Sequence, residues 1–337
     1  MKTKLPLVAT LLCSVIFAAA EPLKVHALNF HRAETDMYFA RFVKQAGGLA
    51  KFHHVRVPTP VEKQDVVRMQ RDTLYSSAVF DLDAGPVTIT LPDAGKRFMS
   101  VLIVNQDHHA METLYAPAKH TFTREQIGTR YFAALVRTFM DPGDPGDIAA
   151  ANAAQDAIAV AQAGSGEFDV PEWDKESHEK ARAALVALGA LGGTKENRFG
   201  RKEDVDTISW LIGTAVGWGG NPPEDAIYLP GYPPQNDGKT AYEVTIKDVP
   251  VDGFWSYTVY DADGFMFEND RKACSVNNVT AKRAADGSVR IRFGGDPQGA
   301  DNYLAIRPGW NYVLRLYRPR KEILDGTWKA PELQQLK

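Results

Sequence analysis

The sequence predicts a mainly β fold with a helical insert, in which two jelly-roll-like antiparallel β-sandwiches form a double jelly-roll-like chain. Two groups of short segments with alternating apolar and polar residues, separated by turn residues, predict the sandwiches. An alanine-rich stretch with helical spacing lies between the groups and predicts the insert. The length of 337 residues supports two domains, because a single hydrophobic core stops growing at about 250–300 residues.

The first 20 residues have the pattern of a secretory signal peptide. Lys2 and Lys4 precede an apolar run from Leu5 to Ala20, and Glu21 follows it. The run is short for a membrane span, which needs about 20 apolar residues, and no later segment offers another candidate. We expect cleavage near Ala20, export to the periplasm or the medium, and no stable membrane insertion.

The charge of the chain narrows the classes of possible partners. The net charge is -3, and the basic residues are scattered, so we expect no nucleic-acid partner. A small molecule or a carbohydrate is the expected ligand.

Cys13 would leave with the signal peptide, and the remaining Cys274 could then form no intramolecular disulfide. We expect Cys274 to be a buried, unreactive thiol. No pattern identifies a cofactor or an oligomeric state.

Residues 21–143 are expected to form the first sandwich. Apolar residues recur at helical spacing over 29–46 before a Gly-Gly stop. The strands that follow are expected at 74–82, 87–91, 98–104, 121–123 and 131–138.

Residues 144–220 are expected to form a helical bridge or insert. The helices are expected at 144–163, 173–191 and 208–216. Alanine covers more than one of their faces, which favours packing against a sheet or another domain over an independent bundle.

Residues 221–337 are expected to form the second sandwich. Alternation predicts strands at 242–246, 254–260, 288–293 and 311–317. Asp-Gly and Pro-Gly pairs between these strands are typical of turns.

Several sequence blocks resemble two families of unknown function. The run Arg-Asp-Thr-Leu-Tyr-Ser at 71–76, followed by an apolar strand, resembles domain-of-unknown-function family 1254. Phe-Trp-Ser-Tyr-Thr-Val-Tyr-Asp at 254–261 and Arg-Leu-Tyr-Arg-Pro at 315–319 resemble its usual partner, family 1214. The resemblance implies an exported chain of two sandwiches and no family-wide catalytic mechanism. Relatives commonly have Asn where this chain has Gln70, a longer amide.

Arg71, Asp72 and Tyr75 form the strongest chemical group in the sequence. A guanidinium, a carboxylate and a phenol just before a strand could converge on a polar ligand. We assign Arg71 to ligand binding and Asp72 and Tyr75 to catalysis. The structural alternative is that the Asp72 side chain stabilises a turn and the Tyr75 ring packs at the edge of the sandwich.

The polar run Asn-Gln-Asp-His-His at 105–109 forms a second candidate, because it leaves an apolar strand where pockets are commonly lined. We assign His108 to catalysis as a general base, and Asp107 and His109 to ligand binding. Adjacent histidines on a strand point to opposite sides, so no metal site is predicted here.

Trp218 lies in a Gly-Trp-Gly-Gly-Asn-Pro-Pro loop at 217–223. Glycines leave an indole poorly covered and prolines stiffen the loop, so we expect Trp218 to contact a ligand.

Two functions remain open. The sequence lacks a Gly-x-Ser-x-Gly elbow, a His-Glu-x-x-His helix and a phosphate-binding loop, which disfavours those enzyme classes. The favoured hypothesis is an exported protein that binds a small polar or aromatic ligand or a carbohydrate in a cleft near the sandwich loops. The alternative is a hydrolase or lyase, with or without a metal, that brings the two polar groups of the first domain together. That alternative requires Asp72 and His108 to lie near each other.

Overall fold

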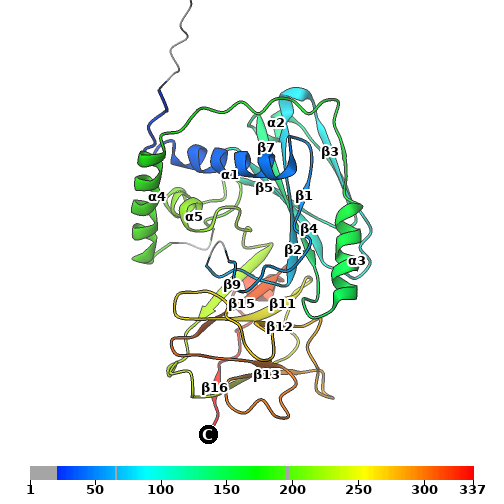
Figure 1. Ribbon diagram of the computed structural model, residues 1–337, viewed down its shortest axis with the longest axis vertical. Helices are drawn as coiled ribbons and strands as arrows, with labels where there is room; N and C mark the ends of the chain where they lie inside the picture. The colour runs from blue at the N-terminus through cyan, green and yellow to red at the C-terminus, as the bar shows by residue number, and fades with distance from the viewer. Residues whose placement is uncertain (1–20, 65–66, 195–196) are drawn as a thin grey trace, which may run out of the picture.

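The computed structural model describes residues 21–64, 67–194 and 197–337. The expected signal peptide, residues 1–20, lies outside the described residues. The described chain forms sheets of five, four, four and three strands, with most of the helices gathered beside the N-terminal half (Figure 1). The predicted mainly β fold of sandwich type is therefore confirmed.

The N-terminal half is a sandwich of two sheets covered by a helix. The larger sheet has the order β1 (His53–His54), β2 (Thr73–Asp81), β7 (Tyr131–Phe139), β4 (Met99–Asn105) and β5 (Ala110–Tyr115). The smaller sheet has the order β6 (Ala118–Phe122), β3 (Val87–Leu91) and β8 (Ala159–Ala161). Phe80 and Phe132 of the larger sheet pack with Ile89 of the smaller one. Helix α1 (Phe30–Ala46) covers the other face of the larger sheet. Every residue of β7 is buried, because both of its faces are covered.

The helical segment differs from the prediction at one end. Helix α3 (Pro145–Asp156) stops before Ala163, and β8 pairs with β3 as a strand. The backbone groups at the edge of β3 and two hydrogen bonds from Gln162 to backbone carbonyls override the helix propensity of alanine. Helices α4 (Lys175–Ala190) and α5 (Thr207–Gly217) form as expected and pack on α1. The short helices are η1 (Leu82–Ala84), α2 (Arg124–Ile127) and α6 (Lys321–Leu324).

The C-terminal half is a second sandwich. One sheet has the order β12 (Ser275–Asn277), β11 (Trp255–Tyr260), β15 (Asn311–Tyr317) and β9 (Ala226–Gly231). The other has the order β14 (Tyr303–Leu304), β13 (Val289–Phe293), β10 (Tyr242–Ile246) and β16 (Gln334–Gln335). The two sheets enclose a core that includes Tyr257, Phe293 and Trp310. Strands β13 and β14 pair in parallel, so the second sheet is mixed.

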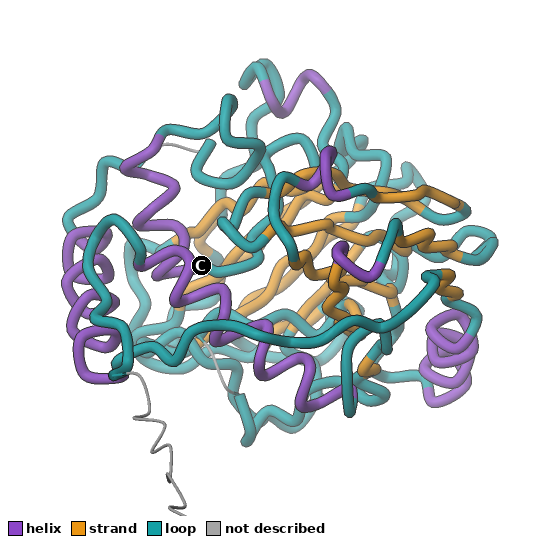
Figure 2. The backbone as a smooth tube through the Cα atoms, turned by 90° about the horizontal axis from the view of Figure 1, so that it is seen from above, coloured by secondary structure: helices purple, strands orange, loops and turns teal. Residues whose placement is uncertain are grey.

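The two halves pack directly on each other (Figure 1). Seen from above, the helices lie around the outside of the strands (Figure 2). Phe98 and Phe139 contact Phe254 and Tyr317 through a cluster of aromatic rings. The segment before β2 also lies on the C-terminal half, where the hydroxyl of Tyr260 donates to its backbone. The start of β2 is therefore fixed against the second sandwich. Within the described ranges, no helix is both long enough and apolar enough to cross a membrane.

Candidate ligand-binding pocket

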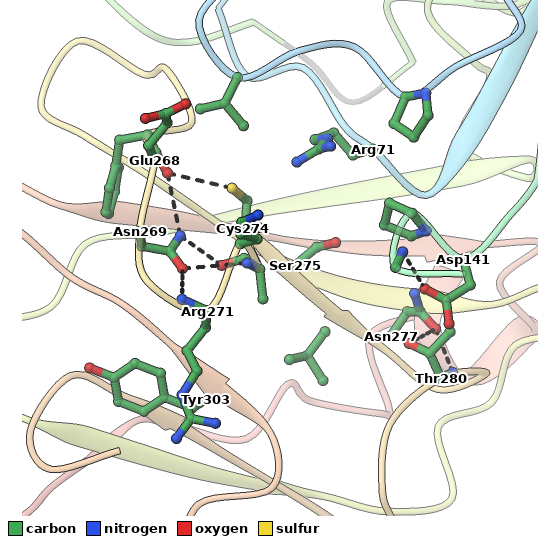
Figure 3. Close-up of a pocket in the computed structure, with 18 of the residues that line it drawn as sticks. Arg71, Asp141, Glu268, Asn269, Arg271, Cys274, Ser275, Asn277, Thr280 and Tyr303 are labelled. Carbon is green, nitrogen blue, oxygen red and sulfur yellow. Dashed lines mark hydrogen bonds between the residues drawn. The ribbon is translucent and has the colours of Figure 1, made fainter. Parts of the chain in front are cut away.

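A pocket of about 1310 Å³ lies where the two halves meet (Figure 3). Arg71 and Asp141 reach it from the N-terminal half, and Cys274, Ser275 and Asn277 reach it from the C-terminal half. This position follows from the sheet order, because β12 is the edge strand of its sheet and faces the segment that leads into β2. The volume exceeds the roughly 300–1,000 Å³ of pockets for drug-sized ligands.

Arg71 is the residue of the N-terminal half that presents a cation to this pocket. Its guanidinium extends into the space opposite Cys274 and Ser275 (Figure 3). The Nε atom is buried and has no hydrogen-bond partner within the described chain. A buried donor without an acceptor is costly, so this geometry favours an oxygen atom from a bound molecule or water.

Asp72 lies behind the floor of the pocket. Its carboxylate is fully buried, and Oδ1 accepts hydrogen bonds of 3.1 Å from Ser275 Oγ and 3.1 Å from Asn277 Nδ2. The other oxygen, Oδ2, is buried without a hydrogen-bond partner among the described residues. Asp72 therefore orients two pocket residues and links the halves, and it does not itself line the pocket.

Gln70 shapes the turn that presents Arg71. Its Oε1 accepts hydrogen bonds from the backbone N–H of Asp72 (2.6 Å) and of Thr73 (3.0 Å). Its Nε2 donates to the hydroxyl of Tyr75 at 3.0 Å. The longer amide at this position thus closes the turn and also fixes Tyr75, which lies outside the pocket lining.

The charges on the pocket wall are mixed, with an acidic excess. The acidic lining residues are Glu62, Asp141, Glu268, Asp270 and Asp301, and the basic ones are Arg71, Arg271 and Lys272. Neutral amides, hydroxyls and the ring of Tyr303 complete the wall. An anionic ligand would meet a net negative wall, whereas a neutral molecule rich in hydroxyl groups would find both donors and acceptors.

Cys274 is a buried free thiol, as the sequence predicts. It is 7% exposed, and its Sγ donates weakly to the carbonyl of Phe267 at 3.6 Å. Burial raises the pKa of the thiol, although the nearby Arg71 guanidinium acts in the opposite direction. The thiol is therefore held in its protonated, weakly reactive form.

His108 lies in a different part of the protein, beneath α5. Its Nδ1 is 2.8 Å from Thr214 Oγ1, and its Nε2 accepts a hydrogen bond of 2.9 Å from the backbone N–H of Gly219. Burial, together with the neighbouring His109 and His31, lowers the pKa of His108 to about 3. Both ring nitrogens are thus occupied within the protein.

The neighbours of His108 are also engaged in internal contacts. Asp107 accepts hydrogen bonds from Arg32, and His31 Nε2 lies 3.5 Å from its Oδ1. Burial alone would raise the pKa of its carboxyl, but His31 and Arg32 lower it. His109 stacks on Trp210 with ring centroids 5.0 Å apart. Trp218 is partly buried, donates from Nε1 to Thr35 and lies against α1.

The two predicted polar groups are not brought together. Thr73 pairs with Phe139, whereas Asn105 pairs with Phe132 at the opposite end of β7. Phe132 and Phe139 are seven positions apart on β7, which corresponds to about 23 Å at a rise of about 3.3 Å per residue. Asp72 and the turn that carries His108 therefore lie at opposite ends of the sheet. Among the described residues, no three His, Cys, Asp or Glu side chains are placed to hold a metal ion.

Arg71, predicted to bind a ligand, lines the pocket, whereas no residue of β12 was predicted to do so. Ser275 and Asn277 lie in a strand of three residues and are more than 200 positions from Asp72, which contacts both. The alternation in Ser-Val-Asn at 275–277 is the signal that places these two side chains on one face, but it is too short to predict a strand.

Comparisons with known proteins agree with the resemblance found in the sequence. A model of a protein of unknown function (DUF1254) matches residues 49–126, and one of a protein of unknown function (DUF1214) matches residues 234–321. No curated protein matches the chain.

Two solved structures share the fold. The VPA0106 protein from Vibrio parahaemolyticus is 17% identical, with a TM-score of 0.68, and the alignment covers 92% of this chain and 98% of that one. An uncharacterized protein from Burkholderia cenocepacia is 14% identical, with a TM-score of 0.52, over 92% of this chain and 87% of that one. At these identities the likeness shows the fold alone.

Proposed function

We propose that this chain, which pairs a DUF1254 region with a DUF1214 region, binds a neutral, hydroxyl-rich molecule such as an oligosaccharide. The site is the pocket between its two halves. The observation that carries the proposal is the Arg71 guanidinium, which extends into a space of about 1310 Å³ with its buried Nε unpaired. The Arg71 side chain is partly exposed and lines this space, so the outer N–H groups of its guanidinium would donate to a sugar hydroxyl or ring oxygen.

The wall of the pocket favours a neutral sugar over an acidic one. Carboxylates such as Glu62 and Asp141 accept hydrogen bonds from hydroxyl groups and repel a carboxylate ligand. The partly buried ring of Tyr303 offers an apolar face on which a sugar ring can stack. The volume is large enough for more than one sugar unit.

We propose that the protein acts outside the cytoplasm, after the signal peptide has been removed. The apolar run that ends at Ala20 supports cleavage before Glu21 and action in the periplasm or the medium. Intact mass spectrometry of the protein recovered from the extracytoplasmic fraction would test this. A mass that includes residues 1–20 would contradict it.

The binding proposal is tested with oligosaccharides of defined composition. Neutral cello-, xylo-, malto- and chito-oligosaccharides and acidic oligogalacturonides are titrated into the protein by isothermal calorimetry. Thermal unfolding is followed in parallel, because a ligand at 100 times its Kd stabilises the folded state by about 2.7 kcal/mol. We expect at least one neutral oligosaccharide to bind, and acidic ones to bind more weakly.

Arg71→Ala is the informative variant, and Arg320→Ala is its matched control. Arg320 is half exposed, pairs with Asp252 and is absent from the pocket lining. We expect Arg71→Ala to weaken oligosaccharide binding by about tenfold or more, since the loss of a charge-assisted hydrogen bond is worth about 1.5–3 kcal/mol. Arg320→Ala should bind like the wild type. Failure of the whole neutral panel to bind, or equal binding by Arg71→Ala, would refute the proposal.

A further inference from the structure

A second, smaller hollow adjoins the pocket between the halves. Its volume is about 280 Å³, and it is lined by residues of the C-terminal half. The residues that line both spaces, which we call the shared wall, are Phe267, Glu268, Asn269, Asp270, Arg271 and Tyr303. The residues that line the second hollow and not the larger pocket are Pro297, Ala305, Ile306 and Arg307. The two spaces are therefore neighbours with one wall in common.

Asn269 fixes the shape of the loop that forms most of the shared wall. Its Nδ2 donates to the carbonyl of Ala273 at 3.0 Å and also to the carbonyl of Phe267 (Figure 3). Its Oδ1 accepts a hydrogen bond of 3.1 Å from the backbone N–H of Arg271. One amide side chain thus pairs backbone groups along the whole loop, as Asn commonly does in turns. The loop therefore keeps its shape through its own hydrogen bonds.

Contacts outside the loop hold it between the two spaces. Gln64 of the N-terminal half donates from Nε2 to the carbonyl of Met266 at 2.8 Å, and its Oε1 accepts from the N–H of Met266 at 2.9 Å. Further along the loop, Arg271 Nη2 donates to the carbonyl of Pro297 at 2.9 Å. Pro297 lines the second hollow. These contacts set the position of the larger pocket relative to the second hollow.

The second hollow combines aromatic rings with balanced charges. The side chains of Phe267 and Tyr303 are partly exposed. The charged lining residues are two acids and two bases, namely Glu268, Asp270, Arg271 and Arg307. Such a lining has no excess of charge that would select an ionic group. Rings beside donors and acceptors suit a sugar unit, which has an apolar face and an edge of hydroxyl groups.

Arg307 is the donor that belongs to the second hollow alone. Its side chain is half exposed, and its guanidinium lies over the ring of Phe267, 4.4 Å from the ring centroid. Its Nη1 is 3.8 Å from Asp261 Oδ2, which is longer than a hydrogen bond. The guanidinium is thus placed beside an aromatic ring with N–H groups that can donate to a ligand. A change at Arg307 leaves the lining of the larger pocket intact.

We propose that the second hollow is a further subsite for the oligosaccharide that the larger pocket binds, so that the ligand extends across the shared wall and the protein selects oligomers over short sugars. This inference rests on the proposed function. A chain that reaches both spaces binds more tightly than one that reaches a single space, because its second contact forms at a high effective concentration.

The test measures affinity against chain length by calorimetry. Cello-, xylo-, malto- and chito-oligosaccharides are titrated from the disaccharide to the hexasaccharide. In a series that binds, we expect the Kd to fall by about tenfold or more from the shortest to the longest member. Equal affinity for the disaccharide and the hexasaccharide, with binding that still depends on Arg71, would overturn this inference and leave the proposed function standing. Failure of every series to bind would refute both.

Arg307→Ala tests the second hollow, and Arg290→Ala is its matched control. Arg290 is also an exposed arginine of the C-terminal half, with Nε 3.5 Å from Glu243, and it is absent from both linings. We expect Arg307→Ala to bind the hexasaccharide about tenfold more weakly and the disaccharide like the wild type. Arg290→Ala should bind both like the wild type, and Arg71→Ala should weaken the binding of both.

Ala305→Trp provides a second variant, because its indole would fill the second hollow. We expect it to bind the disaccharide like the wild type and to lose the gain in affinity with chain length. Its unfolding temperature is measured alongside, and Arg307→Ala, which changes an exposed side chain, remains decisive if Ala305→Trp does not fold. Wild-type dependence on chain length in Arg307→Ala, or in a folded Ala305→Trp, would refute the second subsite.

Discussion

His108 should make the folded protein sensitive to mild acid, and His108→Gln should remove that sensitivity. The hydroxyl of Thr214 donates to the carbonyl of Trp210, so its oxygen accepts from His108 Nδ1–H. The backbone N–H of Gly219 donates to Nε2. The neutral Nδ1–H tautomer satisfies both contacts. A second proton on Nε2 would face the Gly219 N–H and would bury a charge.

The magnitude follows from the shift in pKa. Burial holds the pKa of His108 at about 3 in the folded protein, against about 6.5 in an unfolded chain. Below about pH 6.5 the unfolded chain takes up a proton that the folded protein refuses, so stability is lost as the pH falls. The slope approaches about 1.4 kcal/mol per pH unit. Between pH 7 and pH 5 the loss from this residue is about 2 kcal/mol.

The assay is urea unfolding of the wild type and His108→Gln at pH 5, 6 and 7, followed by tryptophan fluorescence and circular dichroism. Coincidence of the two signals would justify a two-state free energy. Gln retains a donor and an acceptor but cannot titrate. The wild type should therefore have the higher free energy of unfolding at pH 7, and this difference should shrink by about 2 kcal/mol by pH 5. Burial also lowers the pKa of His109, whose contribution is common to both proteins. A constant difference from pH 7 to pH 5 would refute the reasoning.

Two further predictions concern the link between the halves and one tight turn. Asp72→Ala should destabilise the protein by about 3–5 kcal/mol, because it leaves the donors of Ser275 and Asn277 buried without their shared acceptor. Asp72→Asn keeps an oxygen at that position, so its free energy of unfolding should fall much less. Equal losses of free energy for the two variants in urea unfolding would contradict the role of Asp72 as a shared acceptor. Gly238→Ala and Gly287→Ala each place a side chain at positive φ, and we expect each to lower the free energy of unfolding by about 1 kcal/mol for this reason. Only the Cβ at 238 would meet the backbone of Pro308, at 2.4 Å from its nitrogen, so this variant should show the larger drop in Tm.

Strands with a solvent-facing side or strong turn residues could be predicted closely from the sequence. The bounds of β10 and β15 agree with the alternation at 242–246 and 311–317. Strand β9 was missed, because its Pro230 and Gly231 argue against a strand. It is nevertheless an edge strand paired with β15, where a missing N–H is tolerated. Local pattern therefore predicted the central strands and, apart from part of β6 at 121–123, missed the edges that complete the sheets.

The candidate sites show a similar limit. A polar run after a strand predicts exposure, but α5 and the loop around Gly219 cover His108 and occupy both of its nitrogens. Trp218 was expected to be poorly covered by its glycines, and it instead stacks on Tyr38 with ring centroids 4.3 Å apart. Burial of this kind depends on segments about 100 to 180 residues distant, and no local pattern encodes it.

Neither half of the protein contains a complete site. The oxygen that orients Ser275 and Asn277 belongs to Asp72 in the other half, and Arg315 donates to the backbone carbonyl of Arg68 at 2.7 Å. The pocket between the halves therefore depends on how the two sandwiches are placed, because a small shift between them would separate donors from acceptors that come from different halves. A contact surface that serves only stability would be satisfied by apolar packing such as that around Phe254. At this boundary the buried polar contacts of Asp72 with Ser275 and Asn277 instead hold two pocket residues in place, which a binding function requires and packing alone does not.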